Sequence, residues 1–430
     1  MRESLQLLSE DIPDPRQQVV NPCKQEQDFE DRPILRSLSC IVKKNKVYLV
    51  ANVQDIKRCP VTNCTSDGVL MYNTQIAFDR EGNLIARYHK YHLWGEYHSN
   101  VPDEQELVFF DTDFGARIGM YVCFDRVFKE PIIPLIERFN VTTMALSTWF
   151  FDEYPLLLSH QIDQSWSIAL GINILSSNIK RLWSGTTGSG IFTPNHIAGY
   201  THDTSSSGKT IYSMQIVANV PVNPKSKEKC DPDPWIVKQS KYHRKNDTFQ
   251  AFYTDFKEMV TREVSEPEGS GEIICDDDLC CSFDYKIKTG TQSQWWNQEE
   301  ASHQKTFYLG AKSRMRHGYY LSQYKFYEQA CFIIAYDQET GKYETQTRTV
   351  FTDLHISGNF STEYRFPSAL TNDMKLIRTE DLHISGNELC VTSKKPLIYA
   401  GIYARVYDRD PPYVQHDYGN MVIGSTGING

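Results

Sequence analysis

The chain has 430 residues, of which 40 % are hydrophobic and 12 % aromatic, so it can bury a large core and is longer than one ordinary domain. The formal net charge of −9 leaves no basic surplus to neutralise phosphates, which argues against a nucleic-acid partner. No apolar run is long enough to span a membrane. These bounds predict a globular protein of two domains.

Cysteines and glycosylation sequons indicate the compartment. The eleven cysteines are an odd count, which fits five disulfides and one free thiol. Four Asn-x-Ser/Thr sequons begin at Asn63, Asn140, Asn246 and Asn359. Together these features favour an oxidising, extracellular environment.

Two of the disulfides are suggested by short separations. We expect Cys23 to pair with Cys40 and Cys59 with Cys64. The six cysteines from Cys230 onward could pair in about fifteen ways. Only a bond between the neighbours Cys280 and Cys281 is disfavoured, because adjacent residues strain disulfide geometry.

The two ends of the sequence do not carry export signals. Residues 1–15 lack the apolar segment and cleavage site of a signal peptide, and residues 420–430 lack the apolar tail of a GPI signal. We therefore expect the sequence to be an incomplete or alternatively started version of a secreted protein.

The first half of the chain alternates between strand and helix patterns. Residues 1–40 are expected to be irregular, with Pro13 and Pro15 keeping them extended. Strands are predicted over 46–53, 73–78, 84–88, 108–110, 118–122, 143–147, 174–177 and 191–193. A hairpin turn is predicted over 79–83, with Gly82 where a positive φ is needed. Helices are predicted over 129–139, with Pro131 in the first turn, and over 157–171. The alternation from 40 to about 200 predicts an α/β layered domain.

The second half reads differently. Residues 221–248 are polar and without periodicity, which suggests a linker or an ordered excursion. Short β-branched and aromatic runs then predict a β-rich domain with strands over 305–309, 318–324, 330–336, 343–351, 389–392 and 397–407. The heptapeptide DLHISGN occurs at 353–359 and again at 381–387, and we interpret its His355 and His383 as surface residues, not metal ligands.

One stretch has the form of a nucleophile site. The apolar strand 118–122 runs directly into Cys123, and a helix is expected after Arg126, so backbone N–H groups could favour a thiolate. Lys90 and Thr148-Trp149 also follow strands, and we expect all three points to meet at one edge of a sheet. The alternative interpretations are a small core cysteine and a solvated lysine.

At these residues the chain resembles the carbon–nitrogen hydrolases of the nitrilase superfamily, within the vanin and biotinidase branch. The resemblance is carried by ARYHK at 86–90, GMYVCFD at 119–125 and DLCC at 278–281. Shorter matches occur at Ser9–Pro15, Gly95-Glu96, Asn100–Pro102 and Gly188–Ile191. DLCC is specific to this branch, and the matches extend over nearly the whole chain.

The resemblance implies a fold and a domain division. The family fold is a four-layer αββα sandwich, here followed by a β-rich accessory domain. The expected boundaries are 1–215 for the hydrolase domain, 216–250 for the linker and 251–430 for the accessory domain. The first strand and first helix of the sandwich have no counterpart in this chain.

The resemblance also implies a reaction on a small-molecule linear amide without a cofactor or a metal. The family mechanism places a thioester-forming nucleophile on Cys123 and an oxyanion-stabilising ammonium on Lys90. Glu96 would hydrogen-bond or orient the lysine or the attacking group, and the N–H of Phe124 would share the oxyanion hole, with Asp125 beside it in the pocket. Trp149 and Phe150, which follow the next strand, are candidates for the pocket wall, and a plain core role is the alternative. The implied substrate is pantetheine, cleaved to pantothenate and cysteamine, with biotinyl amides such as biocytin as the alternative.

The chain departs from the family at one catalytic position. In the family the general-base glutamate ends a strand upstream of the segment that matches residues 1–15. We therefore expect this chain as it stands to be inactive, and an inactive, truncated extracellular glycoprotein is a further alternative. The sequence indicates a secreted or membrane-attached protein and does not indicate an oligomeric state.

Overall fold

The computed structural model describes residues 2–59, 65–181, 184–202, 210–224, 235–242, 252–288, 306–317 and 324–413. The chain divides into two compact units, one formed by residues 1–106 with 411–430 and the other by residues 107–410.

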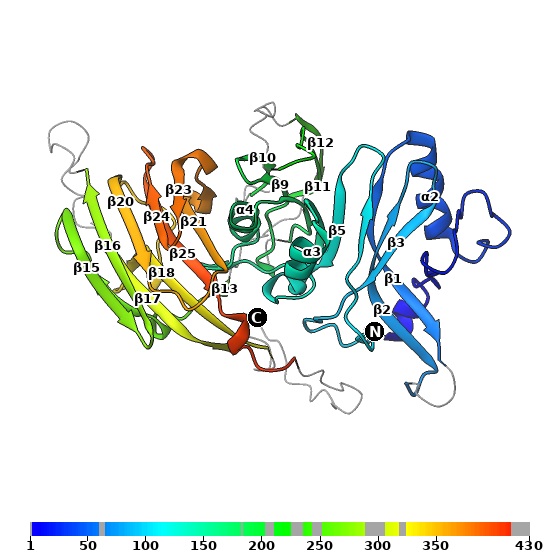
Figure 1. Cartoon of the computed structure of the whole chain (residues 1–430), viewed down its shortest axis with the longest axis horizontal. Coiled ribbons are helices and arrows are strands. Elements are labelled where there is room, and N and C mark those ends of the chain that lie inside the picture. Colours follow the sequence, from blue (N-terminus) through cyan, green and yellow to red (C-terminus); the bar gives the residue numbers. More distant parts are fainter. Residues whose placement is uncertain are drawn as a thin grey trace. The chain divides into compact units, whose positions relative to one another are not determined.

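The first unit is built on a three-stranded antiparallel sheet. The strands β1 (Leu49–Arg58), β2 (Val69–Phe78) and β3 (Leu84–His89) follow in that order across the sheet. The helix α2 (Pro33–Asn45) packs against this sheet (Figure 1), and a short helix, α1 (Arg2–Gln6), precedes α2 in the chain. The core between sheet and helix contains Ile12, Val20, Phe29, Leu35, Val42, Ile76, Phe78 and Leu84.

The expectation that residues 1–40 lack regular structure is wrong. Helix α2 begins at Pro33, a residue favoured in a first helical turn, and its buried Leu35 and Val42 recur at helical spacing. The expected disulfide between Cys23 and Cys40 is confirmed and ties the preceding loop to this helix.

The predicted hairpin between β2 and β3 is confirmed, including its glycine. Gly82 has φ +84°, a left-handed conformation that other residues rarely adopt. A Cβ atom at this position would lie 2.7 Å from the backbone oxygen of Ser39 in α2. The turn therefore packs directly against helix α2, and both its backbone conformation and this contact require glycine at position 82.

The second unit begins with a six-stranded sheet in the order β10-β9-β8-β6-β5-β4. Its strands are β4 (Phe109–Asp111), β5 (Arg117–Val122), β6 (Thr143–Thr148), β8 (Asn173–Asn178), β9 (Gly190–Thr193) and β10 (His196–Tyr200). The central strands β5, β6 and β8 are parallel, as strand–helix–strand connections require. The connecting helices are α3 (Ile132–Phe139) and α4 (Ser159–Leu170).

The helix expected to start soon after Arg126, with Pro131 in its first turn, starts later. Residues Cys123–Val127 form a short 3-10 helix, η1, and Phe128 returns to an extended conformation. Pro131 stands just before α3 and not inside it. Two further strand pairs lie nearby: β7 (Glu153–Tyr154) with β13 (Phe252–Tyr253), and β11 (Thr210–Val217) with β12 (Trp235–Tyr242). Strand β12 lies in the expected linker, of which 225–234 and 243–250 are outside the described residues.

Residues from about 260 onward form two antiparallel sheets that lie face to face (Figure 1). The larger sheet contains β14 (Val260–Glu263), β17 (Thr306–His317), β18 (Lys325–Asp337), β25 (Leu397–Arg405), β21 (Arg365–Thr371) and β22 (Lys375–Leu376), in that order, with β19 (Lys342–Tyr343) beside β18. The smaller sheet contains β15 (Glu268–Asp276), β16 (Leu279–Ile287), β20 (Phe351–Gly358), β24 (Glu388–Val391) and β23 (Leu382–Ser385). Single 3-10 turns occur at η3 (Phe256–Glu258), η4 (Asn372–Met374), η5 (Thr379–Asp381) and η6 (Tyr407–Arg409).

The β-rich character is as predicted, but several strand limits are not. The strand predicted over 343–351 is wrong, because β19 ends at Tyr343 and β20 only begins at Phe351. Most of the strand predicted over 318–324 lies outside the described residues. The two copies of DLHISGN flank β24, and His355 and His383 are both paired in register with Cys390.

The disulfides correct one expectation. Cys280 bonds Cys275 and Cys281 bonds Cys331, so the neighbours do not bond each other, as expected. A single free thiol was expected, yet within the described ranges Cys123 and Cys390 are both free. Cys64, the expected partner of Cys59, is outside those ranges. In the part of the chain that is described, no helix is long and apolar enough to cross a membrane.

Candidate active site

The predicted site residues fall into the two units. Lys90 and Glu96 belong to the first unit, whereas Cys123, Phe124, Asp125 and Trp149 belong to the second. Lys90 follows β3 in the three-stranded sheet, while Cys123 and Trp149 follow β5 and β6 in the six-stranded sheet. The expectation that all three lie at the edge of one sheet is therefore wrong, because β3 pairs with β2 and not with β5.

Lys90 and Glu96 form a tight pair in the first unit. The lysine side chain is buried, and its Nζ lies 2.5 Å from Glu96 Oε2. The same carboxylate accepts hydrogen bonds from the Trp94 N–H at 3.1 Å and from the Asn73 amide. The Asn73 carbonyl in turn accepts the backbone N–H of Lys90 at 2.9 Å. Lys90 is thus held at both ends, by the hydrogen bond of its backbone N–H and by the contact of its ammonium.

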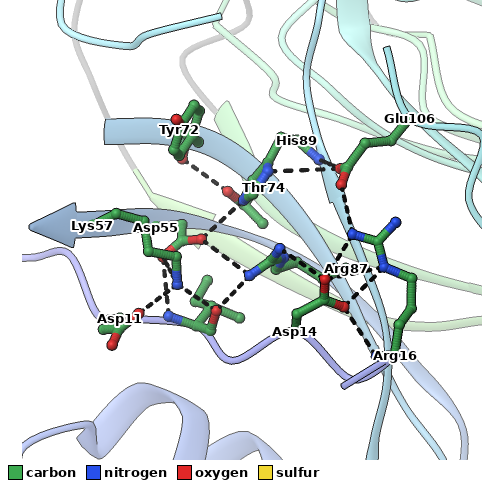
Figure 2. A network of polar contacts seen from close by, with 11 residues as sticks. Asp11, Asp14, Arg16, Asp55, Lys57, Tyr72, Thr74, Arg87, His89 and Glu106 are labelled. Atoms are coloured by element: carbon green, nitrogen blue, oxygen red, sulfur yellow. Dashed lines mark hydrogen bonds and ion pairs between the residues drawn. The ribbon is translucent and has the colours of Figure 1, made fainter. Parts of the chain in front are cut away.

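A polar network holds the end of β3 directly before Lys90 (Figure 2). The fully buried Asp55 of β1 lies 2.9 Å from His89 Nε2 and 3.0 Å from Lys57 Nζ. It also accepts the Ile12 N–H at 3.0 Å, and Glu106 accepts the His89 N–H at 2.8 Å. Although burial alone would raise it, the pKa of Asp55 is lowered, because His89 and Lys57 stabilise the carboxylate.

The same network fastens the segment before α2. Arg16 donates hydrogen bonds to Asp14, and these lower the pKa of Asp14 to about 2. Arg87, on β3, reaches Asp14 at 3.5 Å and donates to the Ile12 carbonyl at 2.8 Å. The segment Ser9–Pro15 is therefore bound to β3, the strand directly before Lys90 (Figure 2).

Cys123 stands at the turn after β5 in the second unit. It has φ +50°, a left-handed backbone conformation that is uncommon outside glycine, and its side chain is half-buried. Its Sγ lies 3.4 Å from the Trp149 carbonyl, so β5 and β6 do bring these two strand ends together. The buried Asp125 side chain accepts the Val122 N–H at 3.0 Å and closes the turn.

The aromatic candidates lie on either side of this turn. Phe124 is buried, with its ring centroid 5.3 Å from that of Phe128 and 5.0 Å from that of Tyr324. Trp149 is 38 % exposed and lies under the guanidinium of Arg181, which is 4.8 Å from the ring centroid. Trp149 thus contacts the thiol through its carbonyl and has a partly exposed side chain, whereas the Phe124 side chain is packed in the interior.

Arg126 and Asn178 were not predicted as site residues. Arg126 is fully buried, pairs with Asp163 at 3.2 Å and lies over the Phe150 ring at 4.5 Å. Asn178, at the end of β8, accepts the Phe150 N–H at 3.1 Å and donates to the Thr187 carbonyl at 2.8 Å. The rule that drew attention to Cys123 and Trp149, a polar residue at the end of a central strand, would have found Asn178 as well.

The described residues offer no arrangement of three or more His, Cys, Asp or Glu side chains that could hold a metal ion. The chemistry they can support is that of a thiol at a strained turn in one unit, and of a buried ammonium–carboxylate pair in the other.

Comparisons with known proteins agree on two regions. Residues 19–138 match the carbon–nitrogen hydrolase family, and residues 249–410 match the vanin C-terminal domain. Pantetheinase of Canis lupus familiaris is 30 % identical over 428 residues, which are 95 % of this chain and 77 % of that protein. Pantetheine hydrolase VNN2 of Homo sapiens is 29 % identical, over 98 % of this chain and 79 % of its own length. Biotinidase of Rattus norvegicus is 28 % identical, over 93 % and 79 %.

Proposed function

Because the chain belongs to the vanin family of carbon–nitrogen hydrolases, we propose that it hydrolyses the linear amide of pantetheine to pantothenate and cysteamine. The observation that carries this proposal is the similarity to pantetheinases over 95 % of the chain, including both matched regions. Biotinidases are similar over nearly the same length, so a biotinyl amide is the second candidate substrate.

In the proposed reaction Cys123 is the nucleophile. Its sulfur attacks the amide carbonyl carbon and forms an S–C bond, the C–N bond breaks, and the thiol proton ends on the departing amine. Water then hydrolyses the thioester and returns a proton to the sulfur. We assign no residue of this chain to the base that carries these protons. The position of Cys123, at the end of a central parallel strand and in a left-handed turn, supports the assignment.

Lys90, Glu96 and Phe124 receive supporting roles. The Lys90 ammonium and the Phe124 N–H would stabilise the negative oxygen of the tetrahedral intermediate. Glu96 would orient Lys90, which the 2.5 Å contact between their side chains supports. We propose Asp125 as the residue that closes the nucleophile turn and Trp149 as part of the pocket wall, since one caps the turn and the other contacts the thiol through its carbonyl.

The test is to incubate the purified protein with pantetheine and to quantify pantothenate by mass spectrometry. Release of pantothenate by the wild-type protein would support the proposed hydrolysis over the inactive alternative; Cys123→Ala should then release none, and Cys390→Ser should match the wild type. In parallel, intact-mass analysis would detect an acyl adduct on Cys123 if the thioester forms and hydrolyses slowly. Absence of both product and adduct, or full activity of Cys123→Ala, would contradict the proposal. Biocytin as a competing substrate separates the two candidate activities.

We also propose an extracellular setting and the domain limits 1–215, 216–250 and 251–430. The disulfides support the setting. The match over 19–138 lies within 1–215, and the match over 249–410 begins two residues before the proposed limit at 251. Of the proposed glycosylation sites, Asn63 and Asn246 lie outside the described residues. Asn140 is exposed at the end of α3, whereas the Asn359 side chain is hydrogen-bonded to the backbone of Cys280 and Asp278. A mass shift on treatment with a peptide N-glycosidase would test these sites.

A further inference from the structure

The turn that contains Cys123 needs support from its surroundings. A non-glycine residue with a left-handed backbone costs about 1–3 kcal/mol and persists only where neighbouring contacts hold it. Here Cys123, with φ +50°, is the first residue of η1, and Val127 is the last. Asp125 supports the turn internally, because its side chain accepts the Val122 N–H and its carbonyl accepts the Phe128 N–H.

External support comes first from α4. The Arg126 guanidinium contacts two residues of α4, the Asp163 carboxylate at 3.2 Å and the Ser159 carbonyl at 3.4 Å. This contact fixes the middle of η1. It does not reach the carbonyl of Val127, at the far end of the same helix.

That carbonyl is held by a residue from a distant part of the chain. Arg405 ends β25, in the region that matches the vanin C-terminal domain, and its Nε donates to the Val127 carbonyl oxygen at 2.8 Å. The Arg405 side chain is fully buried, although arginine is rarely so, and a buried charge needs several partners.

The other partners of Arg405 keep its guanidinium from turning away. One terminal nitrogen contacts Asp410 at 2.5 Å, and the other donates to the Tyr327 carbonyl. Aromatic rings of Phe326 and Tyr407 lie 4.5 and 5.0 Å from the guanidinium carbon. Four groups of the β-rich part thus aim the Nε hydrogen of Arg405 at the η1 carbonyl.

We infer that Arg405 is a positioning residue for Cys123, and that through it the vanin-type region holds the nucleophile turn in its active conformation. The inference rests on the proposed function for the role of Cys123. Arg405 acts through the Val127 carbonyl and the backbone of η1, and it has no part in binding the substrate. A region that sequence comparison separates from the hydrolase motifs is thereby part of the catalytic architecture.

A plain structural role predicts something different. If Arg405 served only to neutralise Asp410 and fill space, its replacement would lower stability and leave the chemistry of the Cys123 thiol unchanged. The variant Arg405→Met with Asp410→Asn removes the Val127 contact and avoids leaving the partly buried Asp410 carboxylate without its ion-pair partner. Asp410→Asn alone retains Arg405 but loses one of the groups that aim it, so its effect should lie between those of the wild type and the double variant. Arg409→Met, which removes the neighbouring arginine that pairs with Asp278 at the surface, is the control.

The experiment measures alkylation of Cys123 by iodoacetamide between pH 5 and 9, quantified on the Cys123 peptide by mass spectrometry. The double variant should show a changed pH–rate profile and at least a several-fold change in rate, Asp410→Asn a smaller change, and the control Arg409→Met should follow the wild type. Pantothenate release should fall about 10–100-fold in kcat with little change in KM, as for a misplaced reacting group. An unchanged alkylation profile in the folded double variant would overturn the inference.

The alkylation arm keeps this test separate from the proposed function, because it needs no turnover. If wild-type protein fails to hydrolyse pantetheine but the double variant still alters Cys123 alkylation, only the proposed substrate or reaction is wrong. If the double variant does not fold, Arg405→Lys replaces it, since one ammonium cannot serve Val127, Tyr327 and Asp410 together. Amide hydrogen exchange over residues 123–128 should then be faster than in wild type, and native exchange there would overturn the inference.

Discussion

The Lys90 ammonium lies 2.5 Å from the Glu96 carboxylate, and three further contacts fix both partners. The lysine is buried, so the carboxylate beside it offsets the cost of burying its charge. The pair therefore behaves as one unit, in which the carboxylate sets the position of the ammonium.

Replacing Glu96 by Gln should lower kcat for pantetheine by about 100-fold, because a misplaced Lys90 ammonium no longer stabilises the oxyanion. KM should change little, since the effect arises in the transition state. Pantothenate release at saturating and limiting substrate measures both constants. Glu104→Gln, an exposed position in the same loop, is the control and should match wild type. Wild-type kcat in Glu96→Gln would remove Glu96 from the site.

His160 should make the protein less stable in mild acid. It lies fully buried on α4, 2.8 Å from the Met374 carbonyl, and burial lowers its pKa to about 4 despite that hydrogen bond. Between the unfolded value of about 6.5 and this value, the unfolded chain binds more protons, so stability is lost as pH falls through this range. The loss attributable to His160 would reach about 3 kcal/mol at pH 4.

Urea unfolding at a series of pH values would detect this loss. His160→Gln, which can still donate to Met374, should flatten the dependence between pH 6.5 and 4. The exposed His383→Gln should leave it unchanged. A dependence of equal steepness in His160→Gln would assign the acid sensitivity elsewhere, for example to the neighbouring His202, whose ring centroid lies 4.2 Å away and whose pKa burial also lowers.

The buried charge cluster in the larger β-sheet should be intolerant of neutralisation. Glu328 is fully buried between Lys312 at 2.7 Å and Arg316 at 3.0 Å, and it accepts the Tyr403 hydroxyl at 3.0 Å. Burial opposes its ionisation, but the two cations hold its pKa at about 2. Because this value is below the unfolded one, the stabilisation is present above about pH 4.5 and is lost as pH falls toward 2.

Glu328→Gln should cost about 3–5 kcal/mol at neutral pH, because it leaves two buried cations short of a partner. Urea unfolding measures the loss. The matched control is Glu268→Gln, which breaks an exposed pair with Lys286 and should change stability by less than about 1 kcal/mol. Equal losses in the free energy of unfolding for the two variants would show that the buried cluster contributes no more to stability than the exposed pair.

The two disulfides of the β-rich part should contribute differently to the free energy of unfolding. Cys281–Cys331 joins β16 of one sheet to β18 of the other across a separation of 50 residues, whereas Cys275–Cys280 closes a separation of 5 within a hairpin. Loop-closure entropy predicts losses of roughly 4 and roughly 2 kcal/mol when each pair is replaced by alanine. Denaturant midpoints under oxidising conditions would compare them, and an equal or reversed order would contradict the entropic account.

Local patterns predicted the features that depend on local chemistry. The strand ending at Cys123, the hairpin glycine at Gly82 and helix α4 all follow from periodicity and turn preferences within a few residues. Helix α2 could also have been found, since Pro33 and the spacing of Leu35 and Val42 are standard helix signals, but the prolines and polar residues before it favoured a loop.

The features that depend on distant partners could not be predicted in this way. Lys90 was assigned to the wrong sheet because strand pairing is set by packing over long separations, which a strand pattern does not encode. The contact between Arg405 and Val127 spans 278 residues and leaves no local signal. The two DLHISGN copies are identical in sequence, yet Ile356 is fully buried and its counterpart Ile384 is 40 % exposed.

Strand β25 is the last described strand to leave the ribosome, yet it lies inside the larger sheet, between β18 and β21. Until residues 397–405 emerge, both of those strands have an unpaired edge in an apolar surrounding. The nascent chain is therefore exposed to edge-to-edge association from the emergence of β18 until that of β25. The closing of the sheet and the arrival of Arg405 beside Val127 then occur together, so the thiol turn is completed only once residue 405 has been synthesised.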